Sequence, residues 1–144
     1  FSFSVLILSI LLNNIFSSEV ITNLKINESY ESEKFKISFE SIEKEDKQNF
    51  KSIIGKFVIE EFDGDAETMK PELRIYNQPN IVTSEADIKI SIFHDKFMTM
   101  NYVQNQDYFN IRYQFKPFMI WIWISTIMLC VSGLLSFIRR KHEK

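Results

Sequence analysis

Residues 109–144 read FNIRYQFKPFMIWIWISTIMLCVSGLLSFIRRKHEK, and this closing stretch decides the fold class. Up to Phe115, apolar and polar side chains alternate, as they do in a strand with one buried face. After Lys116 and Pro117 the pattern changes to an unbroken apolar run that ends in basic residues. Because Pro is tolerated in the first turn of a helix, we expect the strand to pass into a membrane helix at Pro117.

The apolar run, residues 118–138, contains no charged side chain. A helix of this length covers about 31 Å, enough to cross the hydrocarbon core of a bilayer. Trp121 and Trp123 lie near its start, where indole rings favour the headgroup boundary. The basic residues at the other boundary are Arg139, Arg140 and Lys141. The positive-inside rule therefore makes residues 139–144 a basic tail on the cytoplasmic or matrix side.

Small side chains recur along one face of this predicted helix. Such spacing lets another helix approach closely, so these residues are candidates for helix packing. They are Ser125, Ser132, Gly133 and Ser136, and Leu129 lies among them. Ser and Gly are also common in membrane helices generally. The stripe therefore has two interpretations, a helix-packing surface or the ordinary composition of a membrane helix.

The first residues of the chain, 1–16, are also apolar but too few to cross a membrane on their own. One interpretation is the outer end of a truncated transmembrane helix. The other is a signal peptide cleaved before Glu19, although an initiator Met and a basic segment are missing from it. Both interpretations place the following residues on the outer side of the membrane.

Residues 17–115 predict an extracytoplasmic β-rich domain. Three segments alternate with period two, which is typical of strands with one buried face. Their apolar members are Phe35, Ile37 and Phe39; Ile88, Ile90 and Ile92; and Phe109, Ile111, Tyr113 and Phe115. Turn signals separate the segments at residues 63–65, 70–71 and 78–80, and the charged residues 43–51 suggest a solvated hairpin loop. About six or seven strands would form a small sandwich or a barrel-like domain.

Charge and cysteine content exclude several classes of function. Residues 17–115 carry 12 basic and 18 acidic side chains, so the net charge of the domain is −6 and its surface does not suit nucleic acid. Cys130 is the single cysteine, which excludes an intrachain disulfide.

No catalytic set is recognisable, and no metal ligands are expected. His94 next to Asp95 is more typical of a surface histidine than of a ligand or a base. Acidic residues cluster in one segment, but their spacing fits no EF-hand loop, so we interpret them as a solvated turn. They are Glu60, Glu61, Asp63 and Asp65.

Several short elements resemble the C-terminal region of the CcmF family, the large haem-lyase subunit of cytochrome c maturation. The family-motif residues are Pro71, Glu72, Arg74, Tyr76, Thr83, Glu85, Ala86, Lys116, Pro117, Trp121 and Trp123. Ile88, Asp95, Phe97 and the Arg139–Arg140 pair fit the same order. The resemblance covers residues 54–140 and, more loosely, the chain back to Phe1.

The resemblance implies a piece of a larger membrane protein that carries haem b. That parent would take haem from the chaperone CcmE and attach it to apocytochrome c together with CcmH/CcmI-type subunits. This segment would supply an outer docking domain and the last membrane helix. The family's haem-ligating histidine would lie upstream, since residues 1–16 contain none, so no cofactor-binding residue is assigned here. The implied location is the bacterial inner membrane with a periplasmic domain, or the mitochondrial inner membrane with the domain in the intermembrane space.

Two alternatives from other classes remain open. One is a single-pass type I membrane protein with a signal peptide and a β-sandwich binding ectodomain. The other is a membrane-anchored enzyme, which the lack of a catalytic set disfavours.

Overall fold

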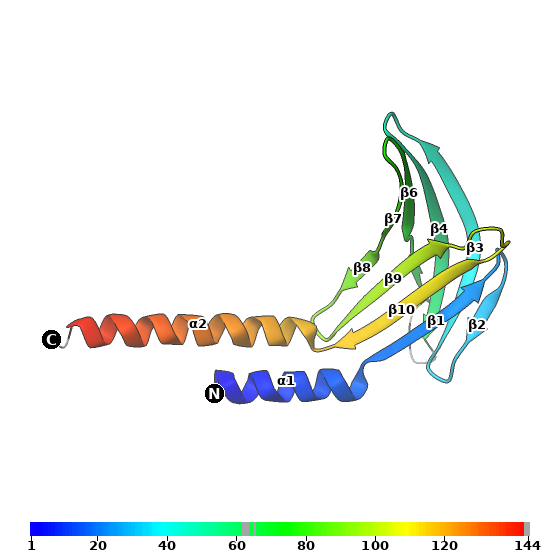
Figure 1. Ribbon diagram of the computed structural model, residues 1–144. Helices are drawn as coiled ribbons and strands as arrows, with labels where there is room; N and C mark the ends of the chain where they lie inside the picture. The colour runs from blue at the N-terminus through cyan, green and yellow to red at the C-terminus, as the bar shows by residue number, and fades with distance from the viewer. Residues whose placement is uncertain (62–63, 65, 143–144) are drawn as a thin grey trace. The chain divides into compact units, whose positions relative to one another are not determined.

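The computed structural model describes residues 1–61, 64 and 66–142, and the backbone alone for residues 140–142. This part of the chain forms two helices and ten strands (Figure 1). They are α1 (Ser2–Phe16), β1 (Ser18–Leu24), β2 (Ser29–Glu31), β3 (Phe35–Asp46), β4 (Phe50–Glu61), β5 (Ala66–Met69), β6 (Glu72–Asn77), β7 (Asn80–Glu85), β8 (Asp87–Ile90), β9 (His94–Tyr102), β10 (Phe109–Pro117) and α2 (Met119–His142).

The strands form two sheets. The first has four strands in the order β1-β10-β9-β8, and the second has the order β2-β3-β4-β6-β7, with β5 also paired to β4. The chain divides into two compact units. One comprises residues 19–89 and 97–114, and the other comprises residues 1–18, 90–96 and 115–144.

The first unit is a β-sandwich whose core comes from both sheets. The buried apolar residues are Leu24, Phe35, Ile37, Phe39, Phe57, Ile59, Met69, Leu73, Met98, Met100, Ile111 and Tyr113. Phe39 stacks on Phe57 at 4.3 Å between ring centroids, and Phe35 meets Tyr113 of the other sheet edge-on at 5.0 Å. The prediction of a mainly-β domain followed by an apolar helix is confirmed.

The long β3–β4 hairpin corrects the expected loop over residues 43–51. β3 continues to Asp46 and β4 begins at Phe50, with the pairs Glu43↔Ile54 and Asp46↔Lys51 still in register. Only residues 47–49 form the turn. The charged residues misled the prediction because the end of β3 is exposed, so its side chains need not alternate in polarity.

The alternating isoleucines at positions 88, 90 and 92 also behave differently from the prediction. β8 ends at Ile90, and the exposed fractions of Ile88, Ile90 and Ile92 are 46%, 71% and 63%. The expected buried face is therefore wrong for this segment. β8 is an edge strand, and its apolar side chains are largely exposed.

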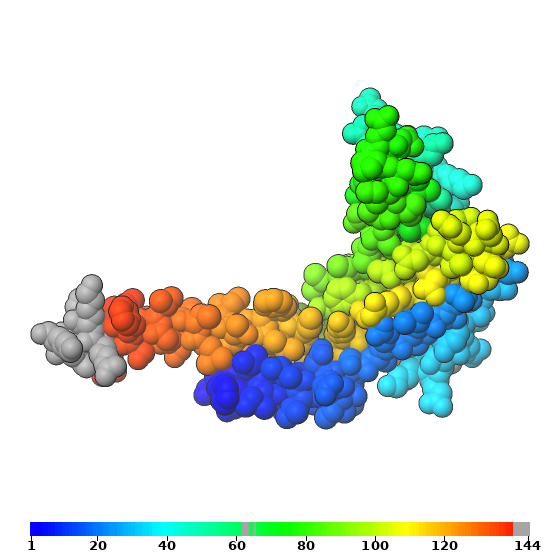
Figure 2. Space-filling model, viewed as in Figure 1, coloured from blue at the N-terminus to red at the C-terminus, as the bar shows by residue number. Residues whose placement is uncertain are grey.

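The second unit contains the two helices, which run antiparallel and side by side (Figures 1 and 2). The Asn13 side-chain amide donates a hydrogen bond to the Pro117 carbonyl, with Nδ2 2.6 Å from the oxygen. Pro117 ends β10 rather than lying in the first helical turn, which corrects the sequence interpretation. Phe118 takes a positive φ of 59° and connects the strand to α2. The left-handed conformation of Phe118 changes the direction of the chain between strand and helix. From the sequence, this change was expected at Pro117.

Candidate functional site on the outer face of β6 and β7

β6 presents two different faces because successive side chains of a strand point to opposite sides. Leu73 is 2% exposed and belongs to the sandwich core. Glu72, Arg74 and Tyr76 alternate with it and therefore lie on the outer face of the six-stranded sheet. The register pairs Arg74 with Ser52 on β4 and with Thr83 on β7, so three strands contribute to this face.

The centre of the face is an ion-pair cluster around Arg74. Its Nε lies 3.0 Å from Oε1 of Glu72, and its Nη2 lies 3.2 Å from Oε2 of the same carboxylate. Its Nη1 lies 3.5 Å from Oε1 of Glu85 on β7. A planar guanidinium with five N–H donors suits such a two-pronged contact, which a lysine could not make.

Ser52 completes the environment of Glu72. This serine is 1% exposed, and its hydroxyl donates a hydrogen bond of 2.6 Å to Oε1 of Glu72. The hydrogen bonds from Arg74 lower the pKa of Glu72, and the one from Ser52 acts in the same direction. Partial burial raises it but is outweighed. Glu72 is therefore held as a carboxylate.

Two aromatic rings border the cluster. The Arg74 guanidinium carbon lies 5.2 Å from the centroid of the Phe50 ring, within the range of a cation–π contact. The Phe50 and Tyr76 rings are 5.3 Å apart across the β4–β6 pair. Hydrogen bonding with Glu72 raises the pKa of Arg74, so this cation is permanent. The cluster, defined as Phe50, Ser52, Glu72, Arg74, Tyr76 and Glu85, is called the Arg74 cluster below.

The side chains of the Arg74 cluster are tied to one another. Its single cation, Arg74, pairs with the carboxylates of Glu72 and Glu85. The Ser52 hydroxyl donates to the Glu72 carboxylate, which is already tied to Arg74. No histidine is among its residues to act as a general base. Among the described residues, no group of three or more His, Cys, Asp or Glu side chains could hold a metal ion.

Two features of the described residues bear on haem binding. His94, the histidine whose side chain the structure describes, stacks on Phe115 with 5.3 Å between ring centroids. A shallow groove of about 410 Å³ lies between the start of α1 and the middle of α2, and neither histidine nor cysteine lines it. A haem iron needs an axial ligand, and Met128 is the lining residue of the groove whose side chain is of a type that ligates haem.

The family-motif residues divide between the two units. The first unit holds Glu72, Arg74 and Tyr76 on β6, Thr83 and Glu85 on β7, buried Pro71 before β6 and exposed Ala86 after β7. Lys116 and Pro117 end β10, and Trp121 and Trp123 lie in the first turns of α2, all in the second unit. The family-motif residues of β6 and β7 thus converge on the Arg74 cluster. Their role stays a prediction.

The small-residue stripe of α2 is only partly buried in this chain. Ser125 is 1% exposed, whereas Ser132, Gly133 and Ser136 are exposed. Ser132 lines the groove beside Phe1. The helix-packing role of the stripe remains untested.

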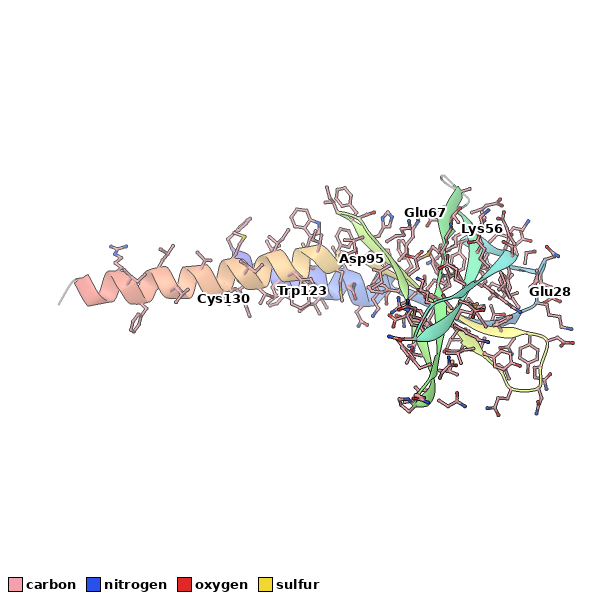
Figure 3. The ribbon with its side chains drawn as sticks, turned by 90° about the horizontal axis from the view of Figure 1, so that it is seen from above. Glu28, Lys56, Glu67, Asp95, Trp123 and Cys130 are labelled. Carbon is pink, nitrogen blue, oxygen red and sulfur yellow. The ribbon has the colours of Figure 1, made fainter. Side chains whose placement is uncertain are left out.

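The residues expected at the membrane boundaries lie at the two ends of α2. Trp123 is 63% exposed, and its position on the helix is marked in Figure 3. Arg139 lies near the other end, while the side chains of Arg140 and Lys141 lie outside the described residues. The interfacial placement of these side chains stays a prediction.

Two of the acidic residues expected in a solvated turn, Glu60 and Glu61, instead end strand β4. Glu60 is exposed and pairs in register with Lys36 and Ala66. Asp63 and Asp65 lie outside the described residues. Glu60 and Glu61 therefore lie at the opposite end of β4 from Phe50 and Ser52 of the Arg74 cluster.

Sequence reasoning missed Phe50, Ser52 and Asn13. Ser52 lies between Phe50 and Ile54 on the outer face of β4, and a hydroxyl in such a strand could have signalled a buried polar partner. Asn13 ends an apolar segment, where an amide can satisfy a free carbonyl. Neither partner could be named, because Glu72 and Pro117 are distant in sequence.

Taken together, these features define a class of protein: a β-sandwich joined directly to a helix that is long and apolar enough to cross a membrane. The CcmF C-terminal beta-sandwich matches residues 15–117. The chain therefore belongs to the CcmF family. This agrees with the resemblance seen in the sequence and disfavours an unrelated type I ectodomain.

Similar proteins support the assignment along almost the whole chain. A cytochrome c-type biogenesis protein, ccl1 of Rhodobacter capsulatus, is 27% identical over 83% of this chain and 18% of its own length. CcmF of Escherichia coli is 24% identical over 98% of this chain and 22% of its own length. The chain thus spans about a fifth of the curated relatives it matches.

A solved structure shares the fold. The protein named cytochrome c heme lyase CcmF aligns with a TM-score of 0.65 over 93% of this chain and 22% of that structure's chain, at 14% identity. At this identity, the likeness concerns the fold alone.

Proposed function

We propose that this chain is the C-terminal part of a CcmF-like haem lyase subunit acting in cytochrome c maturation. In this process, haem passes from a CcmE-type chaperone to apocytochrome c and is attached covalently. The observation that carries the proposal is the family's β-sandwich joined to α2 through the single residue Phe118. So short a connection leaves no stalk between the last strand and the helix.

The proposed topology follows from α2. Its apolar segment, Met119–Arg139, crosses the bilayer with the tryptophans at the outer boundary and the basic tail inside. The sandwich then lies on the outer side, in the periplasm or in the intermembrane space of mitochondria. Residues 1–16 would be the outer end of a second membrane helix, which fits the antiparallel run of α1 along α2.

The proposed task of the sandwich is docking. The Arg74 cluster combines a permanent cation with two aromatic rings, and Arg and Tyr are enriched among the residues that dominate binding energies. The side chain of Arg74 is 33% exposed, so a partner can reach it. We expect the partner to be a CcmH/CcmI-type subunit, CcmE or apocytochrome c, held beside the rest of the CcmF-like polypeptide.

Site-specific photo-crosslinking tests this docking. A benzophenone amino acid at Tyr76 should give an adduct with one of these partners in membranes that are making cytochrome c. The same label at Tyr30, an aromatic position on the edge strand β2, is the matched control. Equal adducts at both positions, or none at Tyr76 while cytochrome c is still assembled, would contradict docking through the Arg74 cluster.

Charge reversal tests the broader idea that the acidic domain attracts its partners. The variant replaces four acidic residues by Lys, namely Glu60, Glu61, Asp63 and Asp65. These changes alter the net charge of the domain from −6 to +2. Recovery of the complex should fall, and the fall should depend on salt. Unchanged recovery would show that partner contact does not use this charge.

A further inference from the structure

The hairpin between β8 and β9 has an apolar tip. The Ser91 N–H donates to the His94 carbonyl at 3.0 Å, which leaves Ile92 and Phe93 as the two tip residues. Hairpin tips normally carry Gly, Asn or Asp, whose conformations and hydrogen bonding suit a tight turn in water. Here the side chains of Ile92 and Phe93 are instead 63% and 62% exposed.

The tip continues into a larger apolar surface. Ile90, the last residue of β8, is 71% exposed and lies two residues before the tip. The neighbouring Asp95 does not expose its carboxylate on this surface. The residue is only 6% exposed, and its carboxylate accepts a hydrogen bond from the Ser91 N–H at 3.3 Å. Adjacent large apolar side chains on a folded surface usually mark a contact with a membrane or another protein. We call Ile90, Ile92 and Phe93 the apolar tip.

One backbone hydrogen bond attaches the apolar tip to the start of α2. The Phe118 N–H donates to the Phe93 carbonyl at 2.7 Å, and the Phe118 carbonyl accepts the Trp121 N–H at 3.2 Å. All of these residues belong to the same compact unit. At 1.5 Å per residue, Trp121 and Trp123 lie within about 8 Å of Phe118 along the helix axis. The tip is therefore level with the first turns of the candidate membrane span.

We propose that the apolar tip inserts into the outer leaflet of the bilayer, at the boundary between headgroups and acyl chains. Lipid is the expected contact of the apolar tip, because a hydrogen bond joins the tip directly to the start of α2, the candidate membrane span. Insertion would remove three large apolar side chains from water, which is favourable because apolar surface is more stable in a hydrocarbon environment. The tip would then be a second membrane attachment that fixes the orientation of the β8–β9 hairpin. This inference rests on the proposed crossing of α2 and is independent of docking through the Arg74 cluster.

The chain offers a matched control for this proposal. The β3–β4 turn has the same form, since the Lys47 N–H donates to the Phe50 carbonyl at 3.0 Å across two tip residues. Its tip residues are polar, Gln48 and Asn49, and both are exposed. The native Cys130 is exposed on α2 and serves as an internal reference for lipid (Figure 3).

The experiment is spin-label accessibility in vesicles of phosphatidylethanolamine and phosphatidylglycerol. Nitroxides are attached to Ile92→Cys, Phe93→Cys and Gln48→Cys, each with Cys130→Ser, and to Cys130 of the unmodified chain. Power saturation then compares collisions with oxygen, which concentrates in lipid, and with a water-soluble nickel chelate. We expect a several-fold higher oxygen-to-nickel ratio at positions 92 and 93 than at 48, shifted towards the ratio at Cys130.

Each outcome decides the proposal. Nickel access at positions 92 and 93 equal to that at 48, with Cys130 in lipid, would overturn tip insertion while leaving the topology intact. Low access to both reagents would show that protein covers the tip, which also overturns it. Nickel access at Cys130 would refute the crossing of α2 itself. Should a tip variant lose the near-ultraviolet circular dichroism of the parent, Ile90→Cys, at the end of a regular strand, gives the same reading.

Discussion

The guanidinium of Arg74 contacts both carboxylate oxygens of Glu72, with Nε at 3.0 Å from Oε1 and Nη2 at 3.2 Å from Oε2. The two residues lie two positions apart on β6, so their side chains share one face of the strand. Contact of the same guanidinium with Glu85 ties β6 to β7. The outer face of the sheet therefore carries its charges in one fixed arrangement.

Replacing Arg74 by Lys should loosen this arrangement although the charge is kept. An ammonium group is a point charge and cannot bridge both oxygens of Glu72 together with Glu85. We expect a lower urea midpoint of unfolding and a larger fall for Arg74→Ala. Arg112→Lys is the control, because Arg112 pairs with Glu19 at an exposed site where ion pairs contribute little. An equal effect of the two Lys variants would contradict a special role for the geometry at Arg74.

The stability of the sandwich should depend on Glu72 in acid. Hydrogen bonds from Arg74 lower the pKa of Glu72 below its ordinary value of 4.5. A carboxyl group with a lowered folded-state pKa stabilises the fold above its unfolded pKa, and this contribution disappears as the pH falls through the folded-state pKa. We therefore expect part of the loss of stability below about pH 4.5 to come from Glu72.

Denaturant unfolding as a function of pH measures this contribution. Glu72→Gln keeps the shape of the side chain and cannot titrate, so its unfolding free energy should fall less steeply between about pH 5 and pH 2 than that of the unmodified chain. The two curves should converge in acid. Parallel curves over this range would mean that Glu72 does not carry the acid dependence.

Period-two alternation predicted the sandwich because it is a local property of strands. It placed Phe35, Ile37 and Phe39 in the core, where each is at most 5% exposed. The same pattern predicted a buried face at Ile88 and Ile90, but these residues lie on an exposed edge strand. Alternation shows which side chains share a face, but whether another element covers that face depends on the topology of the sheets.

The candidate site was only half visible in the sequence. Glu72, Arg74 and Tyr76 were named through the family resemblance and do lie together on β6. Phe50 and Ser52 were missed because they reach Tyr76 and Arg74 through the β4–β6 register, a pairing between strands with β5 between them in the chain. Such a register is set by the packing of the whole sheet and not by local sequence.

Gly55 should be intolerant of any side chain. It is buried on β4, and a Cβ atom there would lie 2.6 Å from Cε2 of Phe57 and 2.8 Å from Sδ of Met100. Met100 can yield, but the Phe57 ring is stacked on Phe39 and has little room. Gly55→Ala should therefore lower the unfolding free energy by about 1–3 kcal/mol, as overpacking does in cores.

The control is Gly64→Ala, because a Cβ atom at Gly64 would meet nothing within 4 Å. Urea unfolding of both variants gives the comparison. A loss at Gly64 as large as the loss at Gly55 would show that the cost comes from the backbone of glycine and not from the crowded core.

Packing of α1 against α2 should depend on the small size of Ser125. Ser125 is 1% exposed, whereas its neighbour Thr126 is exposed. Both hydroxyls donate to the carbonyl four residues earlier, at 2.7 Å and 2.8 Å, so the two residues differ in surroundings rather than in hydrogen bonding. Ser125→Leu should push α1 away from α2 at a cost of about 1–3 kcal/mol, while Thr126→Leu should be tolerated.

A disulfide across the two helices reports this packing. Ser2 and Val131 line the same groove, so we expect cysteines placed at both positions, with Cys130→Ser, to form a disulfide in mild oxidant at a rate that depends on how closely the helices approach. Ser125→Leu should slow this reaction, and Thr126→Leu should leave its rate unchanged. Equal rates in the two variants would show that Ser125 does not set the approach of the helices, and its burial would then be incidental to their packing.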